Sequence, residues 1–439
     1  MDLTQNTDLK NKLIADFRAN EALINGESKA VLHQTRKAAL ENFDKLGFPT
    51  VRHEEWKYSN VKELVKQSFD FGQKTDFGQT EVDTLDIPNL EGNILYFVNG
   101  IYKPELSAIV SSDQNLKISS LTEAIRSNPE LINTYFDKYT NSQNEAFTAL
   151  NTATASDGVV IVVPDNKVVA EPIILRFITD ARTQNAGAQP RNLIVIGQNA
   201  EAKIAEAYRT VGDFAGFTNT VTEIVVGQNA NLQHYKIQNE SEKTYHIGTT
   251  QVSQAANSHF YSATVTLNGG FVRNNLNVVF SGEHSEAYMY GLYFPNGVQH
   301  VDNHTLVDHA MPNCYSNELY KGILKDKSVG VFNGKIFVRQ DAQKTNAYQS
   351  CRNVVLSDEA SMNTKPQLEI YADDVKCSHG TTTGKLNDEA LFYMRSRGIP
   401  KAQAMTLLMF AFCEDVISQI KIDPIRAYLE GLIETKLGE

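Results

Sequence analysis

The chain has 439 residues, which is enough for one large core or for two or three domains. Hydrophobic residues make up 41% of it and charged residues 21%, as in ordinary globular proteins, so disordered and collagen-like classes are excluded. The formal net charge of -11 comes from acidic residues spread along the chain, and it disfavours nucleic acid and anionic membranes as partners.

No segment predicts targeting or membrane insertion. The first ten residues are polar and lack the apolar core of a signal peptide. The most apolar stretch, Met405–Cys413, is well short of the roughly 18 residues that span a bilayer. The cysteines are far apart, with no Cys-x-x-Cys pair, at Cys314, Cys351, Cys377 and Cys413. Such sparse thiols predict a reducing compartment, and the expected location is the cytoplasm.

The first fifty residues or so have helical spacing. Ser28 is a candidate N-cap for a helix whose apolar stripe is Val31, Leu32, Thr35, Ala39 and Phe43. The run Leu46-Gly47-Phe48-Pro49 ends this helix, because glycine follows the last turn and proline lies just beyond it. Residues 69–88 are polar and contain glycine, which predicts a surface loop or linker.

From about Gly158 to His379 the hydrophobic period changes from 3.6 to 2 residues. Val159–Val163 is a continuous β-branched run, typical of a strand buried on both faces. Farther on, four apolar residues alternate with Ser262, Thr264, Thr266 and Asn268, and these four are Tyr261, Ala263, Val265 and Leu267. The alternation predicts strands with one dry and one wet face, and Leu276, Val278 and Phe280 repeat it.

The turns between these strands resemble one another. Gly197-Gln198-Asn199-Ala200 recurs letter for letter as Gly227-Gln228-Asn229-Ala230. Looser echoes follow at 281–284, 325–328 and 357–360. Short strands with similar turns at intervals near 30 residues predict stacked coils of a β-solenoid, and the alternative is a β-sandwich with coincidentally similar turns. Whether the many asparagines form ladders or only turns is open at this point.

Helical spacing returns after Gly384. Asn387 is a candidate cap for a helix that passes Met394 and stops at Arg397-Gly398-Ile399-Pro400. Pro400 starts a second helix, and Asp423-Pro424 starts a third. The predicted architecture is therefore mainly β, with an N-terminal helical region and linker over 1–90, a β core with a mixed entry segment over 91–384, and a C-terminal helical domain over 385–439.

Nucleotide-binding loops are absent from the sequence. Gly330–Lys335 is one residue too short for a phosphate-binding loop, and no Gly-x-Gly-x-x-Gly follows a strand. We therefore expect no nucleotide to be bound by this chain itself. Hydrolytic signatures such as Gly-x-Ser-x-Gly are also absent.

The densest polar cluster is His300-Val301-Asp302-Asn303-His304, with Asp308 and His309 following. Residues four apart on a strand are about 13 Å apart, whereas a metal–nitrogen bond is about 2 Å, so His300 and His304 cannot share one ion on a straight strand. Asp–His pairs on a polar face are the favoured interpretation.

Cys377-Ser378-His379-Gly380 is a sharper candidate. A thiolate and an imidazole two residues apart lie on one face of a strand, and both suit iron or zinc. Two ligands cannot close a tetrahedral site, so a metal here needs donors from elsewhere, such as another chain. A structural cysteine beside a hydrogen-bonded histidine is the alternative.

The C-terminal half resembles the SufB/SufD family of the Suf iron–sulfur cluster assembly machinery. The segments that carry the resemblance are Lys321–Leu324, Phe332–Ile336, Ala342–Ala347, Thr364–Gly380 and Leu391–Ile399, with shorter matches at Glu54–Tyr58 and Phe97–Gly100. Three positions favour the SufD type: SufB has Glu-His-Glu where Ser378-His379-Gly380 stands, a cysteine at Met394, and its cluster-building cysteine near Ser361-Met362.

The resemblance implies a right-handed parallel β-helix with flanking helices and a scaffold role, not an enzyme. It implies a SufB-type paralogue as partner, with a transient iron–sulfur cluster or iron held at the shared interface by His379 and by Cys377. It also implies that the C-terminal helices dock a SufC-type ABC ATPase, and the partner-binding residues expected there are Phe392, Tyr393, Arg395, Arg397, Gly398 and Ile399. In the expected function the complex builds and hands on nascent clusters and assists iron acquisition.

Two competing hypotheses remain at the level of sequence. The first is a β-helix polysaccharide lyase or hydrolase. The second is a purely structural adaptor that never ligates metal. The isolated chain is a possible homodimer.

Overall fold

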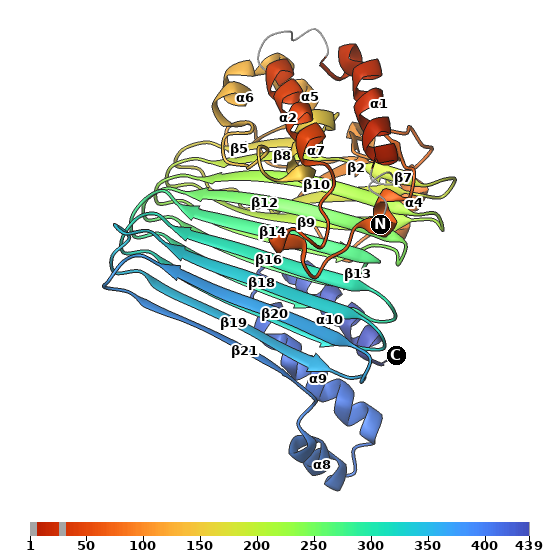
Figure 1. Cartoon of the computed structure of the whole chain (residues 1–439), viewed down its shortest axis with the longest axis vertical. Helices are drawn as coiled ribbons and strands as arrows, with labels where there is room; N and C mark the ends of the chain where they lie inside the picture. The colour runs from red at the N-terminus through yellow and green to blue at the C-terminus, as the bar shows by residue number, and fades with distance from the viewer. Residues whose placement is uncertain (1–6, 26–31, 439) are drawn as a thin grey trace.

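The computed structural model describes residues 7–25 and 32–438, and their elements form a long parallel β-solenoid with helices at both ends (Figure 1). The helices are α1 (Thr7–Asn25), α2 (Leu32–Leu46), η2 (Glu54–Trp56), α3 (Lys62–Val65), α4 (Gln79–Thr84), η3 (Pro104–Leu106), α5 (Leu121–Ser127), α6 (Pro129–Tyr135), α7 (Ala146–Thr154), α8 (Asp388–Ser396), α9 (Lys401–Ile417) and α10 (Asp423–Gly438).

Strands in the first half of the chain are β1 (Asp70–Phe71), β2 (Asn93–Val98), β3 (Ile101–Tyr102), β4 (Lys117–Ser120), β5 (Val159–Val163), β6 (Ile173–Asp180), β7 (Ala186–Ala188), β8 (Arg191–Ile196), β9 (Glu201–Val211) and β10 (Gly216–Val226). Those in the second half are β11 (Asn231–Asn239), β12 (Thr244–Gln254), β13 (His259–Asn268), β14 (Phe271–Phe280), β15 (Glu286–Tyr293), β16 (His300–His309), β17 (Tyr315–Leu324), β18 (Val329–Val338), β19 (Asn346–Val355), β20 (Ser361–Ile370) and β21 (Lys376–Gly384).

From β8 onward, successive strands alternate between two sheets, so that each strand pairs in parallel with the strand two elements away. One sheet ends in the order β16-β18-β20 and the other in the order β17-β19-β21. The register is residue for residue over long stretches, for example Glu318 opposite Gln349 and Gln349 opposite His379. A solenoid is therefore confirmed over a sandwich, because a sandwich would not stack parallel rungs through the whole core.

One corner of the solenoid is an asparagine ladder. Asn199 donates from Nδ2 to Asn166 Oδ1, and Asn229 donates to Asn199 Oδ1, both at 2.8 Å. All three have a positive φ, between 55° and 60°, in the left-handed region that asparagine tolerates better than most residues. The repeated turns at 197–200 and 227–230 are thus stacked on each other, and the echo at 281–284 lies at the same corner. The echoes at 325–328 and 357–360 form the opposite corner.

The prediction of which strand face is wet was wrong for β13 and is confirmed for β14, whose Leu276, Val278 and Phe280 lie in the buried core. Ser262, Thr264 and Thr266 of β13 point between the two sheets and are buried, and Thr266 donates to Gln238 Oε1 at 2.7 Å. The apolar set Ala263, Val265 and Leu267 points outward and is buried together with apolar residues of α9 and α10. Period-2 alternation identifies two faces but not which one a distant helix covers.

At the N-terminal end, α2 ends at Leu46 and Gly47 follows with a φ of +62°, as expected for a helix stop. Ser28, the candidate cap, lies outside the described residues. The prediction of a surface loop for residues 69–88 was wrong in part, since this segment contains β1 and α4 and buries Phe69, Phe77, Val82 and Ile87.

All three C-terminal helices begin close to the predicted punctuation, and α8 also ends close to its predicted stop. Asn387 caps α8 by accepting from the amide of Ala390 at 2.9 Å, and Gly398 has a φ of +89° just past its end. α9 and α10 pack on the outer face of the β15–β17 sheet, whereas α8 has no buried residue and projects from the end of the solenoid (Figure 1). Among the helices described, none is long and apolar enough to cross a membrane.

Candidate functional site

The solenoid has an open end, formed by β20 and β21. Each is the last strand of its sheet, and along the described chain no further strand pairs with it. Side chains on both strands are mostly half-buried or exposed, in contrast to the buried strands of earlier coils. An uncapped end leaves backbone N–H and C=O groups of the last strands without a partner strand.

Cys377 and His379 lie on this open end, in β21. Their register partners in β19 are Ala347 and Gln349, which both point into the interior, so Cys377 and His379 face inward as well. The prediction that the two share one strand face is confirmed. Cys377 is half-buried, and burial raises the pKa of its thiol, while His379 is exposed at the edge.

The two side chains do not make a closed metal site by themselves. Within residues 7–25 and 32–438, no group of three His, Cys, Asp or Glu side chains is placed to hold a metal ion. A tetrahedral or larger coordination sphere would therefore need donors that this chain does not place there.

The remaining cysteines lie deeper. Cys351 points inward one coil behind the open end, is buried, and accepts from Asn353 Nδ2 at 3.3 Å; burial raises the pKa of its thiol to about 11. Cys314 and Cys413 are buried as well. Cys377 is thus the most accessible of the four thiols.

The interior behind the open end carries a polar column that sequence reasoning missed. Glu318 of β17 is fully buried; it accepts from Thr305 Oγ1 at 2.6 Å and from Gln349 Nε2 at 3.4 Å. Burial raises the pKa of Glu318 to about 7. In register, Glu318 lies opposite Gln349 and Gln349 lies opposite His379, so the column leads to the candidate ligand. Only the register between coils reveals this, because the residues are about 30 positions apart in sequence.

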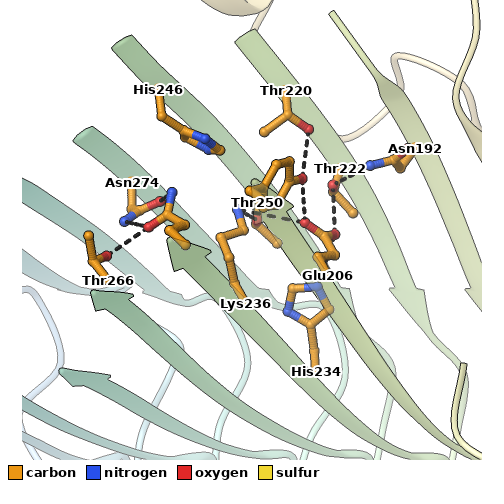
Figure 2. Close-up of polar contacts among 12 residues, drawn as sticks. Asn192, Glu206, Thr220, Thr222, His234, Lys236, His246, Thr250, Thr266 and Asn274 are labelled. Atoms are coloured by element: carbon orange, nitrogen blue, oxygen red, sulfur yellow. Dashed lines mark hydrogen bonds and ion pairs between the residues drawn. The ribbon is translucent and has the colours of Figure 1, made fainter. Parts of the chain in front are cut away.

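Farther inside is a buried charge cluster, shown in Figure 2. Glu206 accepts from Tyr208 Oη at 2.8 Å, from Thr222 Oγ1 at 3.0 Å and lies 3.1 Å from His234 Nε2, while Lys236 Nζ lies 3.9 Å from it. Burial alone would raise the pKa of Glu206, but Lys236 and His234 lower it to about 2. These side chains come from both sheets and converge between them, so the cluster holds the two sheets together.

His300 and His304 of β16 lie on the outer face and contact the N-terminal segment, whereas His309 is buried between the sheets, 2.9 Å from Ser316 Oγ of β17. His304 Nε2 is 2.9 Å from Asp302 Oδ1, and His300 Nε2 is 2.9 Å from Ser59 Oγ. Arg273 bonds Asp302 at 2.9 Å and lies over the Trp56 ring, 3.8 Å from its centroid. The favoured interpretation of Asp–His pairs is confirmed for His304, and these contacts hold residues 56–59 on the outside of the solenoid.

The expected ATPase-docking residues lie on α8 and just after it. Phe392 and Tyr393 are 73% and 59% exposed. Arg397 lies 5.3 Å from the Tyr393 ring centroid and donates to its hydroxyl at 3.3 Å. Gly398 and Ile399 form the turn that leads to α9. The structure thus places two exposed aromatic side chains on the helix that projects from the end of the solenoid.

Comparison with known proteins agrees with this geometry. Residues 177–412 match the family described as "SUF system FeS cluster assembly, SufBD core domain", and residues 7–175 match "SufBD protein N-terminal region". The chain belongs to the SufBD family. The core match includes Cys377, His379 and all of α8.

The chain is also similar to individual named proteins. The chain is 31% identical to the iron-sulfur cluster assembly protein SufD of Escherichia coli (strain K12) over 401 residues, 91% of each chain. It is 32% identical over 424 residues, 95% of this chain and 93% of the relative, to an iron-sulfur cluster assembly SufBD family protein of Synechocystis. It is also 33% identical to "Protein ABCI7, chloroplastic" of Arabidopsis thaliana, covering 66% of this chain and 63% of that one. It is thus a SufD-like iron–sulfur cluster assembly protein.

Proposed function

We propose that this chain is the scaffold subunit that pairs with a SufB-type paralogue through its open solenoid end and builds nascent iron–sulfur clusters at that interface. The observation that carries the proposal is the position of His379 and Cys377, an imidazole and a thiol that face inward on the last strand of the sheet, whose outer edge has no partner strand among the described residues. An incomplete donor set on an open edge is what a site shared by two chains requires. Iron and sulfide are cargo in this proposal, and the chain itself is not an enzyme.

The exposed helix α8 supports a second interface, for a SufC-type ABC ATPase. Phe392 and Tyr393 lie on a helix that contacts α9 and buries no side chain of its own. Exposed aromatic side chains of this size are typical of protein interfaces. The proposed contact set is Phe392 and Tyr393 with Arg395, Arg397, Gly398 and Ile399.

Contacts between α9 and the solenoid support a mechanical connection between the two proposed interfaces. Lys321 of β17 is 3% exposed and donates to the carbonyl oxygen of Phe412 in α9 at 2.8 Å, and it also bonds the Asp415 carboxylate. Movement of the C-terminal helices would therefore act on β17, two coils from β21. Nucleotide-driven approach of two ATPase subunits would shift the population of interface states in this way.

The test is to co-express the chain with SufB- and SufC-type partners and to weigh the complex. We expect a three-component complex, and we expect a chain truncated after Gly384 to keep the SufB-type partner and lose one ATPase subunit. His379→Ala should preserve the complex and abolish cluster formation. A full-length chain that remains alone would contradict the scaffold role, and the same open end would then favour a homodimer of this chain, visible as a doubled mass.

A purely structural adaptor is the second candidate. It is favoured by the fact that only two candidate metal donors, Cys377 and His379, lie together at the open end, and that the described residues contain no group of three. In that case His379→Ala and Cys377→Ala complexes would assemble and retain the same iron and sulfide as the parent complex. Loss of iron or sulfide in either variant would exclude the adaptor.

The four free thiols are consistent with a reducing cytosol as the site of action.

A further inference from the structure

A niche for a single carboxamide lies directly behind the open end. Gly334 of β18 is in mid-strand, where glycine weakens a sheet and often marks the close approach of another group. The group that approaches is the Gln349 side chain, because a Cβ placed on Gly334 would meet Gln349 Cδ at 2.7 Å and Phe332 Cζ at 2.8 Å. The missing side chain of Gly334 therefore makes room for the Gln349 carboxamide.

The orientation of this carboxamide is set by Glu318. Gln349 is 3% exposed, and its Nε2 donates to Glu318 Oε1 at 3.4 Å. Glu318 is itself held on its other oxygen by Thr305 at 2.6 Å. With Nε2 engaged, the free atom is Oε1, a buried acceptor that makes no hydrogen bond in this structure. A buried acceptor without a donor destabilises the fold, so its retention calls for an explanation.

The next side chain along this column is His379. Gln349 and His379 are register partners in neighbouring parallel strands and lie on the same inward face. Neighbouring strands are about 4.8 Å apart, a spacing that an imidazole N–H can bridge to a carboxamide oxygen. The imidazole has two nitrogens, and a metal occupies only one of them.

We propose that Gln349 is a positioning residue for His379: when metal binds, the ring of His379 turns toward Gln349 and donates its second N–H to the free Oε1, which is seated over Gly334 and makes no hydrogen bond in this structure, and this bond fixes which nitrogen faces the iron or cluster at the partner interface. This inference rests on the proposed function of His379 as a ligand. Histidine ligands generally donate their second nitrogen to such an acceptor, which orients the ring and fixes its tautomer.

The experiment is a Co²⁺ titration of the assembled three-component complex, followed by the visible absorption of the bound ion. Gln349→Met keeps the side-chain volume and removes the acceptor, and we expect Co²⁺ to bind about 10- to 100-fold more weakly. Gly334→Ala should weaken binding in the same direction, because it displaces the carboxamide without touching its chemistry. Ser350→Ala, on the opposite face of the same strand, is the matched control and should bind as the parent complex does.

Two further variants separate positioning from a general structural effect. The exchanged pair Glu318→Gln with Gln349→Glu retains an acceptor beside His379 and should restore most of the affinity. In the double variant His379→Ala with Gln349→Met, the loss should equal that of His379→Ala alone, because Gln349 acts through His379.

The outcomes are distinct for the two proposals. If His379→Ala weakens Co²⁺ binding while Gln349→Met and Gly334→Ala bind as the parent does, the positioning role is wrong and the ligand role stands. If the losses add in the double variant, Gln349 acts elsewhere and the inference is also wrong. If His379→Ala binds Co²⁺ normally, both proposals fail.

Discussion

Asparagine in the left-handed region is the residue-scale device that builds the solenoid corner. Asn199 has a φ of +55° and bonds the asparagines of the coils before and after it. Asn199→Ala should lower the free energy of unfolding by about 1–2 kcal/mol. Alanine tolerates the left-handed region less well than asparagine, and it cannot form the hydrogen bonds of the ladder. Asn199→Gly relieves the strain and loses only the ladder, so its melting temperature should lie between those of the parent and the alanine variant. Equal melting temperatures for the alanine and glycine variants would show that backbone strain is unimportant at this corner.

Glu318 makes stability depend on pH in the neutral range. Its pKa is raised from 4.5 to about 7 by burial, so between these values the folded state binds more protons than the unfolded state. The free energy of unfolding therefore falls as pH rises from about 4.5 through 7, and the contribution amounts to about 3 kcal/mol at most. Glu318→Gln should remove this slope.

The measurement for Glu318 is the melting temperature of both proteins at several pH values. The melting temperature of the glutamine variant should rise relative to that of the parent between pH 5 and pH 8, and the difference should grow with pH. A constant difference over this range would mean that Glu318 is ionised throughout.

The buried cluster around Glu206 tests the opposite case, a carboxylate stabilised by a cation. Lys236→Met removes the cation from a fully buried carboxylate, and such a loss typically costs about 3–5 kcal/mol. The double variant Lys236→Met with Glu206→Gln should recover part of that loss, because no uncompensated charge remains. Thermal unfolding of the three proteins measures this, and a double variant less stable than Lys236→Met would contradict it.

Among the elements, helices were the most predictable. The starts of α8, α9 and α10 and the end of α8 are local signals, formed by residues within a few positions of each helix end, such as Asn387 and Gly398. The assignment of strand faces failed in β13 for the converse reason. Whether Ala263 or Thr264 meets water depends on α9 and α10, which lie more than 130 residues later.

α8 should act as a detachable docking element. Phe392→Ala removes a side chain that is 73% exposed, so the melting temperature should hardly change, since such surface substitutions usually lie within about 0.5 kcal/mol. Binding of the ATPase partner, followed by calorimetry, should be lost or strongly weakened. Leu407→Ala, 46% exposed on the neighbouring α9, is the control and should bind normally. Normal ATPase binding by the Phe392 variant would place the interface away from α8.

At the scale of the whole molecule, the repeated turns were enough to predict stacked coils, and a two-residue period was enough to place Cys377 and His379 on one face. The column behind them could not be predicted. Glu318, Gln349 and His379 are in register because the two coils between them are 31 and 30 residues long. That register is set by the geometry of the corners and not by the amino-acid sequence near each residue. Site residues that lie within one strand could therefore be predicted from the sequence, whereas those contributed by neighbouring coils could not.

An open-ended solenoid should also have a gradient of local stability along its axis. Each coil is held by its neighbours, so the middle coils are supported on both sides and β20 and β21 on one side only. In hydrogen exchange of the isolated chain, amides of β20 and β21 should exchange fastest within the solenoid, and those of β10 to β13 slowest. Adding the SufB-type partner should slow exchange in β21, while adding the ATPase should slow it in α8. If exchange in β21 did not change when the partner binds, the two solenoids would not meet at this end. The proposal of a shared site at His379 would then be wrong as well.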